Sequence, residues 1–299
     1  MLTDDQLLKE PILVIGTPRS GKTLTATILS HATGLVYSSE PISIWAIGAS
    51  SGPDDRRYVE EATPATIKRI RSLCAKAVRR AGGDRYIDDL AYHGLRLDFI
   101  RAVMPDALIV HVIQDGLIAI PQMVNGWTFT EPLYKTIVRR WRGLSPYTMV
   151  RTLPRLAKRF LVNHWASKVE GRRRAWGPQP PGLAAFAAEH PDPAEIAAFQ
   201  WRALVEFTLD GLAQQPADRV MTIRFEDLLA DPLEVTAKLA AFCRITDRES
   251  VQLAAQRILD PTAAKKGVKL TPQQWSRVAE IIGPLRQRLR YVPEMPAQS

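Results

Sequence analysis

The 299-residue sequence predicts an α/β fold of the phosphate-loop type, a three-layer arrangement with a central, mainly parallel sheet flanked by helices, plus a helical insertion. Three observations support this prediction. Short apolar runs rich in β-branched residues alternate with segments of helical periodicity. The first run ends in a glycine-rich loop that opens a helix. The resulting β-α-β-α-β order favours parallel strands, because each strand must return through a crossover connection.

The individual elements follow in chain order. Short apolar runs, typical of buried parallel strands, predict strands over residues 11–17, 35–40, 85–90, 107–116 and 218–228. Helical spacing predicts helices over residues 20–34, 64–81, 95–105, 117–127, 195–214, 231–245 and 271–291. Cys74 and Cys243 occur in apolar, helical contexts, which predicts packing in the core rather than a metal site.

The region from about 128 to 200 departs from this pattern, and we interpret it as a basic helical insertion within one domain spanning 1–299. From Lys135 to Arg174 there are twelve lysines and arginines and one acid, whereas the rest of the chain has 28 bases and 30 acids. An apolar stripe from Met149 to Leu161 is bordered by bases, as in helices that lie on membrane surfaces. We expect a cap over the acceptor side that binds lipid or an acidic glycan; the alternative is packing on the sheet domain.

Location and partners follow from composition. The chain has no apolar run of about 18 residues, and its N-terminus carries acids where a signal peptide needs bases. We therefore expect a cytoplasmic protein, with peripheral contact at the inner membrane face through the basic region. The aromatic residues of that region form no stacking-platform motif, which disfavours nucleic acid as a partner.

The loop "GTPRSGKT" fits the phosphate-loop template G-x-x-x-x-G-K-[ST] at Gly16, Gly21, Lys22 and Thr23. Glycines let backbone N–H groups turn toward one point, and the following helix adds its free N–H groups and positive dipole end. This combination predicts phosphate binding but does not identify the nucleotide.

A kinase or nucleotide hydrolase of this type also needs a carboxylate for magnesium, usually at the end of a neighbouring strand. Asp115 and Asp88 are the formal candidates. Neither decides the matter, because acids commonly end strands.

Several segments in order resemble the sulfotransferase superfamily, particularly its bacterial and tyrosylprotein-type branch. They are "GTPRSGKT", "FIRAVMPDALIVHVIQDG", "WGPQPPGL", "DRVMTIRFEDLLADPLEVTAKLAAFC" and "KKGVKLTPQQW". The resemblance implies transfer of a sulfuryl group from 3′-phosphoadenosine 5′-phosphosulfate to a hydroxyl or amine by in-line displacement, without a metal. The acceptor would be a small molecule, a glycan or a lipid.

The resemblance also implies roles for individual residues. The 5′-phosphosulfate would be held by Pro18, Arg19, Ser20, Gly21, Lys22, Thr23 and Leu24. Arg19 and Lys22 would also stabilise the charge of the transferred group. Glu40 would be the base that deprotonates the acceptor; the alternative is a cap on the following turn. His93 is a second candidate base, with a packing or surface role as the alternative.

The 3′-phosphate site departs from the family pattern. Gln114 and Gln122 stand where arginine and serine are usual, which removes a full charge. A closing loop that carries Lys265, Lys266, Gly267 and Lys269 could compensate. Arg224 and Glu226 are expected to pair with each other inside the fold.

Two further departures suggest a hypothesis. An acid, Asp88, stands near the position of a usual lysine, and Lys22 stands where a threonine is usual. Lys22 would then replace the lost cation from the other side of the leaving phosphate. Arg19→Ala and Lys22→Ala are each expected to abolish donor binding or transfer in an intact fold.

Three functions remain open on the sequence alone. The first is an active sulfotransferase. The second is a P-loop kinase or hydrolase that uses ATP or GTP, and the third is a non-catalytic protein that retains the sulfotransferase fold.

Overall fold

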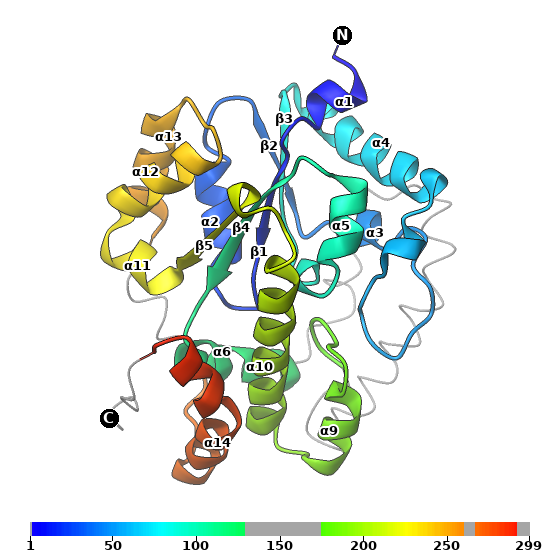
Figure 1. Cartoon of the computed structure of the whole chain (residues 1–299). Coiled ribbons are helices and arrows are strands. Elements are labelled where there is room, and N and C mark those ends of the chain that lie inside the picture. Colours follow the sequence, from blue (N-terminus) through cyan, green and yellow to red (C-terminus); the bar gives the residue numbers. More distant parts are fainter. Residues whose placement is uncertain (1, 129–174, 260–266, 292–299) are drawn as a thin grey trace.

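The computed structural model describes residues 2–128, 175–259 and 267–291. Its centre is a five-stranded sheet in the order β2-β3-β1-β4-β5, in which every neighbouring pair is parallel. The strands are β1 (Ile12–Ile15), β2 (Leu35–Ser39), β3 (Arg85–Asp89), β4 (Leu108–Ile113) and β5 (Val220–Arg224). The sheet and its flanking helices confirm the predicted α/β fold (Figure 1).

Alternate residues of β1 face two different helical layers. Ile12 and Val14 pack with the cluster that contains helices α2 (Lys22–Leu29), α11 (Phe225–Ala230), α12 (Pro232–Phe242) and α13 (Arg248–Ile258). Leu13 and Ile15 pack with the cluster that contains α1 (Asp4–Leu7), α3 (Ile42–Trp45), α4 (Pro64–Ala81) and α5 (Leu97–Val103). Side chains alternate between the two faces of a strand, and both faces of β1 are covered by helices. All four residues of β1 are therefore buried, which explains why the run is apolar at every position.

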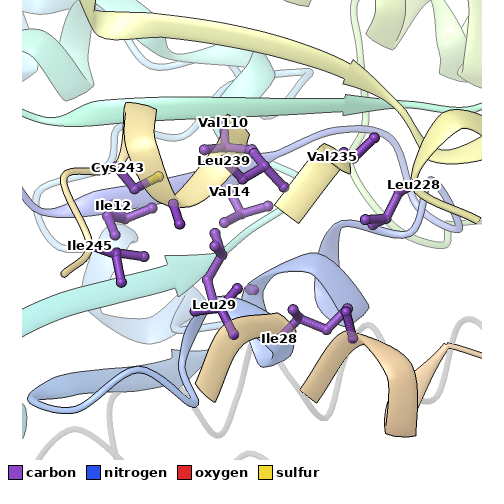
Figure 2. Packing of buried hydrophobic residues seen from close by; sticks show 14 of the residues in the cluster. Ile12, Val14, Ile28, Leu29, Val110, Leu228, Val235, Leu239, Cys243 and Ile245 are labelled. Atoms are coloured by element: carbon purple, nitrogen blue, oxygen red, sulfur yellow. The ribbon is translucent and has the colours of Figure 1, made fainter. Parts of the chain in front are cut away.

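The first of these layers is built by segments far apart in the chain. Figure 2 shows Ile12 and Val14 of β1 with Leu29 of α2 and Leu239 of α12. Cys243 lies in this cluster and Cys74 in the other; both thiols are free and fully buried. The predicted core role of the two cysteines is therefore confirmed.

A third cluster lies beyond the carboxyl ends of the strands. It joins α6 (Gly116–Thr128), α9 (Leu183–Glu189), α10 (Pro193–Leu212) and α14 (Pro272–Arg288). Trp201 of α10 is fully buried there. Residues 175–200, predicted as part of the insertion, therefore belong in part to this packed body. The basic segment from Lys135 to Arg174 lies outside the described residues, so its helical cap stays a prediction.

Some element ends differ from the predicted ones. Helix α2 ends at Leu29, because the chain turns through Ser30 before Gly34 takes a positive φ of 85°. The last strand stops at Arg224 and is followed at once by α11, whose acidic first turn suits a helix N-terminus. The sequence pattern does not predict helices α3 and α13. The described helices include none that is long and apolar enough to span a membrane.

Candidate active site

The loop between β1 and α2 has the backbone that an anion cradle requires. Gly21 is the N-cap of α2 with φ of 87°, and an added Cβ would lie 2.1 Å from the ring of Phe225. A Cβ on Gly16 would lie 2.3 Å from the carbonyl oxygen of Val112. Both positions therefore require glycine. Because α2 begins at Lys22, its free N–H groups and positive dipole end lie at the loop.

The hydroxyl group of Ser20 lies inside this loop. Its side chain is fully buried, and its Oγ has no hydrogen-bond partner among the described residues. The Oγ would lie 2.5 Å from a Cβ on Gly16, so the two residues adjoin in the loop. Buried hydroxyls normally have a partner. An oxyanion seated in the loop would provide one.

The other predicted loop residues divide into exposed and packed groups. Arg19 is exposed and takes a positive φ of 67°, while Thr23 is exposed in the first turn of α2. Leu24 is half-buried and packs against the cluster of α2 and α12. Pro18 lies near Gly177, whose added Cβ would be 3.6 Å from Pro18 Cγ. The segment after residue 175 therefore adjoins the loop.

Lys22 is not a free cation. Its side chain is 5% exposed, and its Nζ lies 3.0 Å from Asp89 Oδ2 and 3.5 Å from Glu40 Oε1. The hydroxyl of Thr23 is also within hydrogen-bond distance, at 3.3 Å. The predicted phosphate-binding lysine is thus held between two carboxylates.

Asp89 lies at the centre of the site, although no sequence motif singles it out. It is fully buried at the end of β3 and accepts hydrogen bonds from Lys22 Nζ (3.0 Å), Thr23 Oγ1 (2.5 Å), Tyr37 OH (2.7 Å) and the Glu40 backbone N–H (3.1 Å). Burial and the Asp89 charge raise the pKa of the Tyr37 hydroxyl, so Tyr37 stays a donor. Asp89 thereby ties the loop helix to the end of β2.

Asp88 and His93 form a separate buried cluster on the opposite face of β3. Asp88 accepts hydrogen bonds from Trp45 Nε1 (2.8 Å), Tyr86 OH (3.1 Å) and His93 Nε2 (3.0 Å). His93 is fully buried, with the Trp45 ring edge-on at 4.7 Å between centroids. The structure therefore does not bring His93 to the loop as a second base, and it places Asp89, not Asp88, beside Lys22.

The carboxylate of Glu40 contacts Lys22 of the loop and also faces solvent. It directly follows β2 at the carboxyl edge of the sheet, and its side chain is 54% exposed. Its φ of 43° is unusual for a residue with a Cβ, and the hydrogen bond from its N–H to Asp89 holds this conformation. The carboxylate therefore reaches Lys22 on one side and is open to solvent on the other. Ligands of open α/β sheets bind at this edge.

Gln114 directly follows β4, in the connection to α6, and Gln122 lies in the middle of α6. Gln114 is 2% exposed, and its Oε1 has no hydrogen-bond partner among the described residues. Gln122 Nε2 donates to the carbonyl of Ile118 at 3.3 Å. The end of the closing loop reaches this helix, since a Cβ on Gly267 would lie 3.2 Å from Gln122 N. Lys269, two residues later, is exposed. Lys265 and Lys266 lie outside the described residues.

We expect Gln114→Arg to strengthen binding of 3′-phosphorylated nucleotide, because an arginine at the end of β4 could donate a charge-assisted hydrogen bond to the 3′-phosphate. The ratio of affinities for adenosine 3′,5′-bisphosphate and adenosine 5′-phosphate should rise in calorimetric titrations. Since residue 114 is buried, the melting temperature of the variant has to be measured first. An unchanged ratio in a folded variant would mean that this side chain does not reach the 3′-phosphate.

The remaining candidates have structural partners. Arg286 binds Asp115 with two hydrogen bonds, of 2.7 and 2.8 Å, which occupies this candidate magnesium ligand. Glu226 accepts from the Asp115 N–H at 2.8 Å, and burial raises the pKa of the Glu226 carboxyl. Arg224 donates to the carbonyl of Leu289 at 2.6 Å instead of pairing with Glu226. Both have the predicted structural role, without the predicted mutual contact.

Comparison with solved structures finds low identity over most of the chain. A sulfotransferase domain from the curacin biosynthetic pathway is 14% identical, with a TM-score of 0.48 over 93% of this chain and 98% of that one. Sulfotransferase STF9 from Mycobacterium avium is 11% identical, with a TM-score of 0.49 over 95% of this chain and 78% of that one. A mouse sulfotransferase complexed with PAP is 12% identical, with a TM-score of 0.46 over 97% of this chain and 89% of that one.

No curated protein matches the sequence. The model of the sulfotransferase family, in contrast, matches residues 11–165, just over half of the chain. The match includes the loop, Glu40, Asp89 and Gln114. The chain therefore belongs to the sulfotransferase family.

Proposed function

We propose that the protein transfers a sulfuryl group from 3′-phosphoadenosine 5′-phosphosulfate to a hydroxyl or amine acceptor. The observation that carries the proposal is the buried Ser20 hydroxyl without a partner among the described residues, inside an anion loop that adjoins Glu40. An oxyanion in the loop would satisfy Ser20. Glu40 would then be the nearby carboxylate with access to solvent. Family membership supports sulfuryl transfer as the chemistry.

In this proposal, a small number of groups in the loop bind the phosphosulfate of the donor. The N–H groups at the start of α2, the Ser20 hydroxyl and the exposed Arg19 would bind its oxygens. Gln114 Oε1, also buried with no partner in the described part of the chain, would lie near the nucleoside end. The N–H groups of α2, Ser20 and Arg19 are donors and fit an anionic ligand at the loop. When bound, the donor supplies the sulfuryl group, which moves from its 5′-phosphate to the acceptor oxygen or nitrogen.

In the proposed reaction Glu40 takes the proton of the acceptor, and the loop stabilises the negative charge of the leaving phosphate. Glu40 accepts the acceptor proton while the acceptor atom bonds to sulfur and the bond from sulfur to the bridging phosphate oxygen breaks. Arg19 and the N–H groups of α2 stabilise the negative charge left on the phosphate. Lys22, 3.5 Å from Glu40, keeps this carboxylate directed toward the loop. In-line transfer needs this arrangement of base, reacting atom and anion site.

For the acceptor we propose a small molecule, a glycan or a lipid. The side chain of Glu40 is more than half exposed, so the acceptor side is open in the described structure. Peripheral contact of the basic region with an anionic membrane surface is part of this proposal. That region lies outside the described residues, and the contact rests on its sequence, in which bases border an apolar stripe.

The test is a titration with adenosine 3′,5′-bisphosphate, adenosine 5′-phosphate and ATP, followed by radiolabelled sulfate transfer to a panel of phenols, amines and saccharides. We expect the bisphosphate to bind most tightly and at least one acceptor to be labelled. Binding of ATP or GTP with magnesium but not of the bisphosphate would instead select a P-loop kinase or hydrolase. Binding of the bisphosphate without transfer to any acceptor would leave a non-catalytic protein.

A further inference from the structure

The charged residues of helix α4 are all basic. Its 18 residues include six lysines and arginines and no acid. When these six and the segment from Lys135 to Arg174 are set aside, the rest of the chain has 22 bases and 30 acids. The helix is thus a positive element on a body whose remaining charge is negative. An anionic surface would attract α4 and repel most of the body around it.

The bases of α4 lie on the face opposite to its buried face. Ile70, Cys74 and Val78 are fully buried in the cluster that also contains α1 and α5. The exposed bases fall within an arc of about 120° on the other side of the helix, over about 18 Å of its length. These bases, which we call the basic stripe, are Lys68, Arg69, Lys76, Arg79 and Arg80.

Most of the basic stripe has no partner within the described protein. Arg79 pairs with Asp4 of α1 at 2.6 Å. The other four bases, Lys68, Arg69, Lys76 and Arg80, make no hydrogen bond or ion pair with other described residues. Since no carboxylate neutralises these four side chains, their attraction for an external anion is undiminished.

Exposed apolar side chains adjoin the basic stripe. Five large hydrophobic side chains are exposed in the described part of the chain, and three of them, Leu2, Tyr58 and Val59, belong to segments next to α4. Leu2 precedes α1, which is paired with α4, and the other two lie shortly before α4 begins at Pro64. Their side chains are 45–51% exposed. Bases mixed with exposed apolar and aromatic side chains are typical of surfaces that bind anionic membranes. A nucleic acid backbone would attract the bases only.

The chain path places the beginning of α4 at the edge of the sheet that carries the candidate active site. The helix connects β2 to β3, which run parallel, so it begins near the carboxyl ends of the strands and ends near their amino ends. Val36 of β2 packs on the same cluster as Ile70 of α4, and Glu40 directly follows β2. Figure 1 shows α4 on the outer side of the molecule, with α1 beside its end. A surface bound by α4 would therefore lie on the side of the sheet that ends at Glu40.

We propose that the outer face of α4 binds an anionic phospholipid surface. The four unpaired bases of the basic stripe lie over the phosphate head groups, and Leu2, Tyr58 and Val59 enter the interface with the acyl chains. The inference goes beyond the proposed function, which assigns membrane contact to the segment from Lys135 to Arg174.

The experiment is co-sedimentation of the full chain at low salt with two kinds of vesicle. One is phosphatidylcholine alone, and the other is an equimolar mixture of phosphatidylcholine and phosphatidylglycerol. We expect binding to the mixed vesicles only. A four-fold variant replaces the unpaired bases: Lys68→Gln, Arg69→Gln, Lys76→Gln and Arg80→Gln. It should bind the mixed vesicles about a hundred-fold more weakly, because each base near an anionic membrane strengthens binding about five-fold.

A matched control removes the same charge from another side chain set. It replaces four exposed bases of α13 and of the end of α14: Arg248→Gln, Arg257→Gln, Arg288→Gln and Arg290→Gln. Its affinity for the mixed vesicles should stay within about three-fold of the unmodified protein. Both variants change exposed side chains, so both should melt at the temperature of the unmodified protein. Tyr58→Ser with Val59→Ser should also weaken binding, by about ten-fold.

The outcomes separate this inference from the alternatives. Unchanged vesicle binding in the α4 variant would overturn it and leave the segment from Lys135 to Arg174 as the contact. Equal losses in the α4 variant and the control would show that net charge alone drives binding, which also overturns it. No binding of the unmodified protein to mixed vesicles, with α4-dependent binding to double-stranded DNA, would identify nucleic acid as the partner instead. Vesicle binding is measured without donor or acceptor, so the proposed function stands or fails separately in its own titration.

Discussion

Replacing Glu40 by glutamine is expected to lower turnover by about 10²–10⁴-fold while the affinity for adenosine 3′,5′-bisphosphate stays unchanged. The glutamine oxygen can still accept a hydrogen bond from Lys22, 3.5 Å away, so the loop keeps its geometry. The amide cannot accept a proton from the acceptor, however. The loss should therefore appear in turnover and not in donor binding.

The measurement compares single-turnover sulfate transfer with calorimetric binding, using the best acceptor from the panel. Glu60→Gln is the matched control, because it makes the same change at an exposed carboxylate in the 3-10 helix Val59–Glu61. It should leave both quantities unaltered. A collapse of donor affinity in Glu40→Gln would mean that Glu40 shapes the loop and is not the base. Turnover close to that of the unmodified protein would remove Glu40 from the mechanism altogether.

The fold was predictable because its signals are local. Each of these signals lies within one short segment: the apolar runs predict β1 and β4, and the glycines predict the loop. The order of the segments then favours a parallel sheet. The short helix α3 gave little signal, since four residues carry no helical period. Helix α13 has only three buried residues in eleven, which makes its apolar stripe weak.

Residues of the candidate site could be predicted from the sequence only where a single short segment contains the motif. The loop and Glu40 are of this kind. Asp88 and Asp89 are adjacent, and which of them faces α2 depends on the register of β3 against β1. The alternation of side chains along β3 distinguishes the two acids. Ile87 packs on the layer of α2 and Tyr86 on the layer of α4, so Asp89, two residues after Ile87, lies on the same face as Ile87, toward the loop. Position at the end of an apolar run, the signal that pointed to Asp88, does not distinguish the two faces of the strand.

Pairings between distant segments account for the other misses. The ion pair of Asp115 with Arg286 joins residues 171 positions apart, so the sequence around one residue does not indicate the other as its partner. Arg224 and Glu226 looked like partners because they are close in the chain. In a strand followed by a helix they have different neighbours, the Leu289 carbonyl and the Asp115 N–H.

The buried contact between Lys22 and Asp89 changes the result expected of substitutions at Lys22. The sequence alone predicts that Lys22→Ala leaves the fold intact. Both side chains are almost fully buried, with 5% and 0% exposure, so removing the lysine leaves a buried carboxylate without its cation. Breaking a buried ion pair from one side typically costs about 3–5 kcal/mol. We therefore expect Lys22→Met to lower the free energy of unfolding by an amount in that range.

Removing both charges should reverse most of this loss. In Lys22→Met with Asp89→Asn, the asparagine can still accept hydrogen bonds from Thr23 and Tyr37, and no buried charge is left unpaired at this contact. Urea unfolding should show the double variant recovering at least half of the stability lost in Lys22→Met, while sulfate transfer stays abolished. Lys238→Met, which breaks an exposed pair with Glu234, is the control and should unfold like the unmodified protein. Equal stability of the double and single variants would show that the two charges do not depend on each other, and that Lys22 contributes to the loop through packing alone.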